Sequence, residues 1–161
     1  MNVTDSDISP MNDPLPPNEQ AAWRAFLSVA SRAIEQIDQA LQKQSNMTLT
    51  DYEILRVLGE ADKSRLRMSE LAAQVHVSRS RLTYRVDRLA VVGFVTREEC
   101  DDDRRGLWAI LTDKGGEAFA RATPDHHAEI RRLLFMTLDR RSLGVFETAL
   151  QSMAYRLDGD H

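Results

Sequence analysis

Apolar side chains recur at steps of three and four residues over most of the chain, which is the spacing of one face of an α-helix. A long first stripe, beginning after Asn18, consists of Trp23, Phe26, Ala30, Ile34, Ile37 and Leu41. A stripe close to the C-terminus consists of Leu143, Phe146, Leu150, Met153 and Leu157. The pattern predicts a mainly α-helical protein with a long amphipathic helix near each end.

A second helix is predicted to begin around residue 50. Thr50 and Glu53 have the Thr-x-x-Glu spacing of a capping box, in which each side chain satisfies a free backbone N–H at a helix start. The same helix would bury three apolar side chains, Ile54, Leu55 and Leu58. The charged run from Asp62 to Arg65 then predicts a loop.

Two helices follow in close succession, with Ser69 and Ser78 as their predicted N-caps. Only His76 and Val77 lie between the first of these helices and the second cap. So short a connection makes the helices cross steeply, as in a helix-turn-helix. Gly93 suits the left-handed backbone position that ends the second helix.

Beyond Gly93 the apolar period changes from helical to alternating, which predicts a β-hairpin. Its strands would be Phe94 to Glu99 and Leu107 to Leu111, joined by a polar turn from Cys100 to Gly106. Thr112 is the predicted cap of the next helix, in which Pro124 is expected to cause a kink.

The charge of the chain is acidic overall and basic in one place. The formal net charge is -4 and the isoelectric point about 5.6, which excludes a histone-like protein that coats nucleic acid with its whole surface. Between Ser78 and Val92, however, four arginines stand against Asp87, so the segment carries 4 − 1 = +3. These arginines are Arg79, Arg81, Arg85 and Arg88.

The helix that follows Ser78 is the candidate for DNA recognition, because the second helix of a helix-turn-helix enters the major groove. A helical wheel turns Leu82, Val86 and Leu89 inward and places Arg85 near the buried flank. We expect base-edge contacts from Ser80, Arg81, Thr83 and Tyr84, and phosphate contacts from Arg79 and Arg88. The alternative is an ordinary solvated, charged helix face.

The predicted hairpin tip combines three acidic residues, Asp101, Asp102 and Asp103, with Arg104 and Arg105. A carboxylate that holds a guanidinium in place reduces the entropy that the arginine loses on entering a narrow groove. The tip is therefore a candidate minor-groove probe. The alternative is a solvated tip whose exposed ion pairs contribute little energy.

Several short runs together resemble the MarR (multiple antibiotic resistance regulator) family. They are Met68-Ser-Glu-Leu-Ala, Ser80-Arg-Leu-Thr, Val86-Asp-Arg-Leu, Gly93-Phe-Val, Asp103-Arg-Arg and Leu111-Thr-x-x-Gly. The resemblance extends from about Asn18 to Leu157, and its joint motifs are specific although each is weak alone. In the family's Asp-x-Arg wing motif the Asp orients the Arg toward the minor groove. Asp103 and Arg105 occupy those places, with Arg104 between them.

The resemblance implies a winged helix-turn-helix with six helices, a two-stranded β wing and terminal dimerisation helices. On this basis we expect a disordered arm at residues 1–17, a dimerisation helix at 18–48, the DNA-binding region at 49–112 and C-terminal dimerisation helices at 113–161. Cys100 and two extra acids replace the family's commoner Pro-containing turn, which puts the shape of the wing tip in question.

The expected partners are a double-stranded DNA operator and a second copy of the chain. Apolar stripes at both chain ends exceed what so small a domain can bury, and an intramolecular bundle ranks below a homodimer. The resemblance also implies a repressor of a pseudo-palindromic operator that a small ligand releases, for which an aromatic acid or phenol is the candidate. Trp23, Phe26 and His126 or His127 could line its site, although core or surface roles are favoured for each.

Other chemistry receives little support from the sequence. The lone Cys100 fits a reducing, cytoplasmic location and is disfavoured as a redox switch by its acidic neighbours. No cofactor is predicted. No metal is predicted either, since His126 and His127 are adjacent and lack i, i+4 spacing. Membrane association is not expected, because no segment is long and apolar enough to span a bilayer. One alternative to a DNA-binding regulator is a winged-helix module used only for dimerisation or protein contact, without specific DNA binding. The other is an enzyme, which no phosphate loop or nucleophile motif supports.

Overall fold

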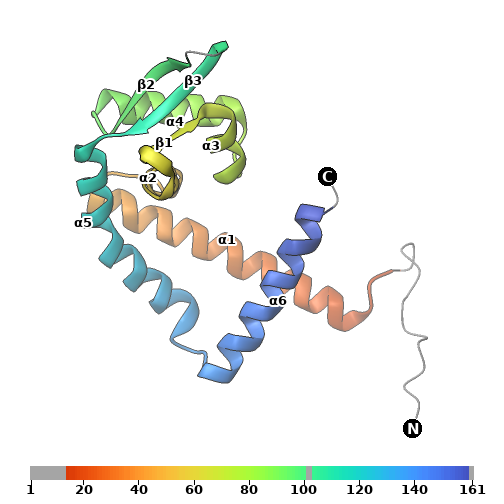
Figure 1. Cartoon of the computed structure of the whole chain (residues 1–161). Coiled ribbons are helices and arrows are strands. Elements are labelled where there is room, and N and C mark those ends of the chain that lie inside the picture. Colours follow the sequence, from red (N-terminus) through yellow and green to blue (C-terminus); the bar gives the residue numbers. More distant parts are fainter. Residues whose placement is uncertain (1–13, 101–102, 160–161) are drawn as a thin grey trace. The chain divides into compact units, whose positions relative to one another are not determined.

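The computed structural model describes residues 14–100 and 103–159, with the backbone alone described at residues 100, 103–105 and 158. Figure 1 shows the elements, which are α1 (Pro17–Ser45), α2 (Leu49–Glu60), a 3-10 turn (Asp62–Ser64), β1 (Arg65–Arg67), α3 (Met68–Gln74), α4 (Arg79–Val91), β2 (Val95–Cys100), β3 (Asp103–Leu111), α5 (Asp113–Ile130), a π-helical turn (Arg131–Phe135) and α6 (Arg140–Gly159). The mainly α fold class is thereby confirmed. Of the predicted arm, residues 1–13 lie outside the described residues.

The chain divides into two compact units, Met1–Arg32 and Ala33–His161. In the first unit the first half of α1 begins at Pro17, one residue before the predicted start, because proline suits the first position of a helix. Trp23 and Phe26 stack with ring centroids 6.0 Å apart, and about half of each side chain is exposed. This part of the predicted stripe is therefore not buried within the first unit.

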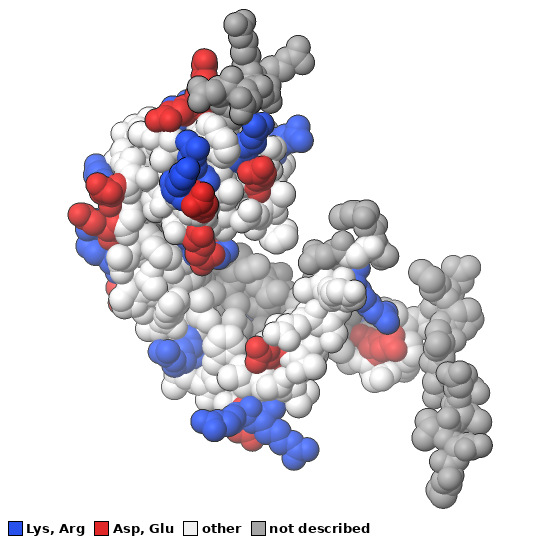
Figure 2. Space-filling model, in the orientation of Figure 1, with Lys and Arg blue, Asp and Glu red and all other residues white. Residues whose placement is uncertain are grey.

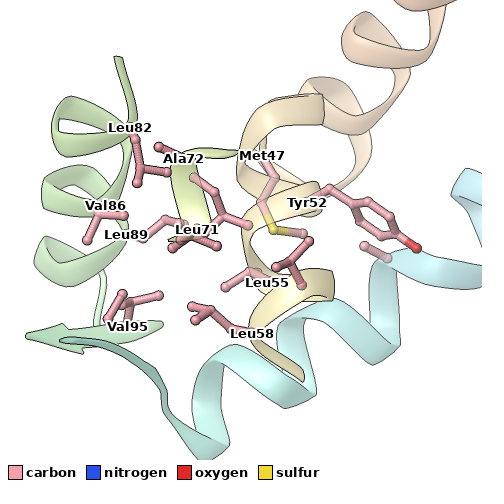
Figure 3. Close-up of a cluster of buried hydrophobic side chains, with 14 of the residues drawn as sticks. Met47, Tyr52, Leu55, Leu58, Leu71, Ala72, Leu82, Val86, Leu89 and Val95 are labelled. Carbon is pink, nitrogen blue, oxygen red and sulfur yellow. The ribbon is translucent and has the colours of Figure 1, made fainter. Parts of the chain in front are cut away.

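The core of the second unit lies between α2, α3, α4 and the sheet (Figure 3). The side chains predicted to face inward from α2 and α4 are all buried, which confirms both helical patterns. These residues are Ile54, Leu55, Leu58, Leu82, Val86 and Leu89. Ile37 and Leu41, from the second half of α1, belong to the same cluster.

The capping box of α2 is not the predicted one. Thr48 is the N-cap: its hydroxyl accepts from the Asp51 N–H at 3.1 Å, and the Asp51 carboxylate accepts from the Thr48 N–H at 2.9 Å. The Thr50 and Glu53 prediction was wrong because Glu53 forms an ion pair with Arg56 at 2.8 Å instead. The helix therefore begins at Leu49.

The other helix ends mostly follow the sequence. Ser78 and Thr112 are confirmed as N-caps, and Gly93 as the left-handed residue with φ +77°. Ser69 is wrong as a cap, because Arg67 is the N-cap, two residues earlier: α3 begins at Met68, and the Glu70 carboxylate accepts from the Arg67 N–H at 3.3 Å.

The sheet has three antiparallel strands in the described residues, in the order β1-β3-β2, so the two-stranded prediction was incomplete. The predicted loop at Asp62–Arg65 was wrong at its end, since Arg65 begins β1. β1 pairs Arg65 with Ile110 and Arg67 with Trp108. This pairing joins segments distant in sequence, so local alternation gives no signal for it.

Two further predictions concern the hairpin turn and Pro124. The turn was predicted too long, because β3 already begins at Asp103. α5 contains Pro124 and continues to Ile130, beyond which the helix widens into the π-helical turn. The kink at Pro124 stays a prediction.

Candidate nucleic-acid interface

The helix-turn-helix consists of α3 and α4. Val75, His76 and Val77 connect α3 to the Ser78 cap, and His76 adopts a left-handed backbone with φ +54°. The Ser78 hydroxyl accepts from the Arg81 N–H at 3.3 Å and fixes the start of α4. Both helices pack on α2 through their apolar sides, so the other side of α4 is left to solvent.

Every residue predicted to contact DNA from α4 is exposed. They are Arg79, Ser80, Arg81, Thr83, Tyr84 and Arg88. The Thr83 hydroxyl donates to the Arg79 carbonyl at 2.9 Å, which leaves its oxygen as an acceptor for a base amino group. The structure therefore gathers guanidinium, hydroxyl and phenol groups on one helix face, a set able to bond both bases and phosphates.

Arg85 has a different role from its neighbours. It is half-buried, and its Nη1 lies 3.7 Å from Oδ2 of the buried Asp51. Its position near the buried flank is thus confirmed. The ion pair ties the middle of α4 to the first turn of α2.

Arg97 was missed by the sequence analysis. Its guanidinium Nη1 lies 2.6 Å from Oδ1 of Asp87, so that β2 is connected to the outer side of α4. The negative charge of Asp87 is therefore balanced by Arg97, so it offsets less of the positive charge of the α4 arginines than the simple sum of +3 suggests. The only signal in the sequence was an unassigned arginine within the alternating segment.

The wing is described in part. β2 and β3 form a ladder that includes Glu98 paired with Trp108 and a register shift between Glu99 and Cys100. The backbone of Asp103, Arg104 and Arg105 belongs to β3, whereas their side chains, like residues 101 and 102, lie outside the described part of the chain. The proposed orientation of Arg105 by Asp103 therefore stays a prediction.

Charge is mixed rather than uniform on the view in Figure 2, where basic and acidic groups alternate over the surface. Such a surface agrees with a net charge of -4 and with attraction confined to a local patch. On this face, DNA contact would have to rely on particular arginines rather than on a uniformly basic surface.

The remaining candidates divide between core and surface. His126 is buried, with its ring centroid 4.1 Å from that of Tyr52, whereas His127 is exposed. Burial lowers the pKa of His126 below its usual value, and the positive charge of His127 lowers it further, against an opposing effect of Glu53.

The Cys100 side chain lies outside the part of the chain that the structure describes. Among described residues, no three His, Cys, Asp or Glu side chains are grouped as a metal site would require.

Comparison with known proteins decides the family. The sequence profile of the MarR family matches residues 45–106. The crystal structure of AbsC from Streptomyces coelicolor aligns with a TM-score of 0.82 and 38% identity, over 91% of this chain and 99% of AbsC. The chain belongs to the MarR family of transcriptional regulators.

Two further proteins similar to this chain are informative. Sco3205 from Streptomyces coelicolor, solved in complex with DNA, aligns with a TM-score of 0.82 and 35% identity over 88% of this chain and 89% of Sco3205. The transcriptional repressor MprA of Escherichia coli is 28% identical over 91% of this chain and 82% of its own length. Family and fold identify a transcription regulator and not an enzyme. Within residues 14–100 and 103–159, no helix is both long and apolar enough to cross a membrane.

Proposed function

We propose that this MarR-family protein binds a pseudo-palindromic DNA operator as a homodimer and represses transcription in the cytoplasm until a small effector releases it. One observation carries the proposal. α4 buries Leu82, Val86 and Leu89 on one side and exposes all six predicted DNA-contacting side chains elsewhere. A helix so arranged can dock in the major groove without disturbing its own core.

Each exposed group has a role that follows from its chemistry. Ser80, Arg81, Thr83 and Tyr84 lie in the first half of α4, the part of a recognition helix that approaches base edges. Arg79 and Arg88 stand nearer its two ends and would bind phosphates, which fix the register of the protein on the duplex.

The wing would reach the adjacent minor groove. β2 and β3 run side by side (Figure 1), and the Asp87–Arg97 ion pair connects β2 to α4. In this proposal Asp103 orients Arg105, and Arg104 lies between them along β3. The narrow groove attracts arginine through its enhanced negative potential.

The dimer would use α6. Its stripe of large apolar side chains is between 38% and 75% exposed in the single chain, at Leu143, Phe146, Leu150, Met153 and Leu157. Twofold symmetry would place two α4 helices about 34 Å apart, which matches successive major grooves.

Repression is supported by the name of a relative, and effector release would follow from differential binding to two states of the dimer. MprA is named a transcriptional repressor, and Sco3205 was solved with DNA. An effector such as an aromatic acid or phenol would act by binding better to a dimer whose half-site spacing does not fit DNA, with a coupling of about 1–3 kcal/mol.

The test is selection of preferred sequences from random duplexes by the full-length protein, followed by the Arg81→Ala variant. Loss of a bidentate base contact should cost about 1–3 kcal/mol at one base-pair position and leave the other positions unchanged. Equal weakening on all sequences would make Arg81 a phosphate contact. A parent protein that selects no sequence would contradict the proposed function.

A further inference from the structure

Asp51 is a buried carboxylate whose compensating charge comes from α4. Only 7% of the residue is exposed, although it lies in the first turn of α2. Its Oδ2 atom accepts from the Thr48 N–H at 2.9 Å, and its Oδ1 atom is buried without a hydrogen-bond partner among the described residues. Its ion pair is with Arg85, whose Nη1 atom lies 3.7 Å from Oδ2. Because a buried carboxylate that loses its cation is strongly destabilising, the pair favours an Arg85 side chain that stays against α2.

Arg85 also contacts the neighbouring side chain on the recognition helix. Its guanidinium carbon lies 5.6 Å from the ring centroid of Tyr84, within the range of a cation–π contact. Tyr84 is 57% exposed and is one of the candidates for base contact. The Arg85 guanidinium therefore connects a buried carboxylate of α2 to an exposed aromatic ring of α4.

This connection affects how Tyr84 can meet DNA. An exposed tyrosine that turns freely in solution loses conformational entropy when it packs on a base edge. A guanidinium held beside the ring restricts the ring before DNA arrives, and so lowers that entropy cost for one orientation of the ring. Arg85 differs in this from the other arginines of α4, which are all exposed at Arg79, Arg81 and Arg88.

We propose that Asp51 and Arg85 are positioning residues for base recognition: Asp51 fixes the Arg85 guanidinium, and Arg85 fixes the ring of Tyr84 for its contact with the bases. The inference rests on the proposed function, in which Tyr84 reads base edges. It gives Arg85 an effect on the choice of sequence, exerted through Tyr84, in place of a contact with a phosphate.

The experiment selects preferred sequences from random duplexes with the full-length parent and with Tyr84→Ala, which identifies the base-pair positions that depend on the ring. Arg85→Gln removes the guanidinium and should lower discrimination at those same positions by about two- to fivefold, the factor that corresponds to an exposed cation–π contact. Binding measured between about 50 and 200 mM salt should keep the parental salt slope, whereas loss of a phosphate contact would reduce the slope by about 0.9.

Asp51→Asn tests the other contact of Arg85. The amide oxygen can still accept from the Thr48 N–H, so the cap of α2 remains while the charge that holds Arg85 is lost. Discrimination should again fall at the positions that depend on Tyr84. Glu60→Gln is the control, since it makes the same carboxylate-to-amide change at the end of α2, where Glu60 pairs with Arg56 at 2.7 Å. It should leave the selected sequences unchanged.

A combined variant separates positioning from a general loosening of α4. Arg85→Gln together with Tyr84→Ala should relax the selection no further than Tyr84→Ala alone, since both changes act through the same ring. A loosened helix would instead add its effect to that of Tyr84→Ala. Thermal melting reports whether each variant is folded. If Arg85→Gln is unfolded because Asp51 lacks its cation, the double variant Asp51→Asn with Arg85→Gln, which removes both charges, decides in its place.

Three results with Arg85→Gln would overturn the inference: parental discrimination, a salt slope reduced by about 0.9, or relaxation at positions that Tyr84→Ala does not affect. A Tyr84→Ala protein that selects the same bases as the parent would overturn it too, as would additive effects in the combined variant. If Arg81→Ala relaxes specificity while Arg85→Gln selects like the parent, only this inference fails. A parent protein that selects no sequence overturns the proposed function as well.

Discussion

His126 is a titratable residue held in an apolar setting. Only 6% of it is exposed, its ring packs on Tyr52, and its Nδ1 is buried without a hydrogen-bond partner among the described residues. Burial lowers its pKa, because the charged imidazolium loses more hydration than the neutral ring. In the unfolded chain the pKa returns to the ordinary value of 6.5.

The free energy of unfolding should therefore decrease as pH falls from about 7.5 to 5.5. In this window His126 becomes protonated in the unfolded chain but stays neutral in the folded protein, so protonation stabilises the unfolded state. His126→Phe keeps a ring against Tyr52 and cannot titrate. We expect its free energy of unfolding, measured with urea at a series of pH values, to change less across this window than that of the parent.

His127→Gln is the matched control. It removes the exposed neighbour and leaves the main cause, burial of His126, in place, so most of the pH dependence should persist. Identical pH profiles for the parent and His126→Phe would show that another group titrates on unfolding.

At the scale of elements, the junction of the wing and α5 depends on one close contact. A Cβ built on Gly115 would lie 2.2 Å from the Phe94 carbonyl oxygen and 2.8 Å from the Leu111 side chain. Thr112 strengthens the junction, since its hydroxyl donates to the Gly93 carbonyl at 2.8 Å and accepts from the Gly115 N–H at 3.0 Å. Only glycine therefore fits at position 115, in the first turn of α5 after the end of β3.

Gly115→Ala should destabilise the protein by about 1–3 kcal/mol, as expected for overpacking against backbone that cannot move freely. Gly116→Ala is the matched control in the same helical turn, because its nearest contact is an ordinary 4.0 Å from Leu111. It should leave stability unchanged or raise it by up to about 1 kcal/mol through helix propensity. Urea unfolding of both variants measures the difference, and equal effects would contradict the tight junction.

At the scale of the whole molecule, the exposed apolar stripe of α6 needs an explanation that the single chain does not supply. Phe146 and Leu150 are 42% and 38% exposed, although both belong to the apolar side of the helix. A second copy that covers this side would remove the apolar area from water and fix the distance between two recognition helices.

Leu150→Glu should convert the dimer into a monomer, because it places a carboxylate where apolar contact is required. With one half-site bound instead of two, operator affinity should fall by about 100-fold or more. Sedimentation equilibrium gives the oligomeric state and a duplex titration gives the affinity.

Thr148→Glu tests the same change of charge on the opposite side of α6 and should leave both measurements unchanged. A Leu150→Glu protein that remains dimeric and binds the operator like the parent would remove this helix from the dimer interface.

The sequence by itself determined what depends on neighbours along the chain. The helical period placed Leu82, Val86 and Leu89 inside α4 and the six DNA-contacting candidates outside, because position on a helix face follows from spacing alone. Ser78, Thr112 and Gly93 marked helix ends correctly, since caps are local interactions.

Only the tertiary structure decided what depends on residues distant in sequence. β1 forms because Arg65–Arg67 pairs with β3, and the sequence of neither segment alone predicts that pairing. The Asp87–Arg97 ion pair and the Arg67–Trp108 stack exist for the same reason. Tertiary contact also helps to decide that Thr48 rather than Thr50 caps α2. The Leu49 N–H donates to Asp38 of α1 at 2.7 Å, which helps to place the start of the helix at Leu49. Local spacing thus fixes which faces are apolar, whereas the packing of separate segments selects the partner of each polar group.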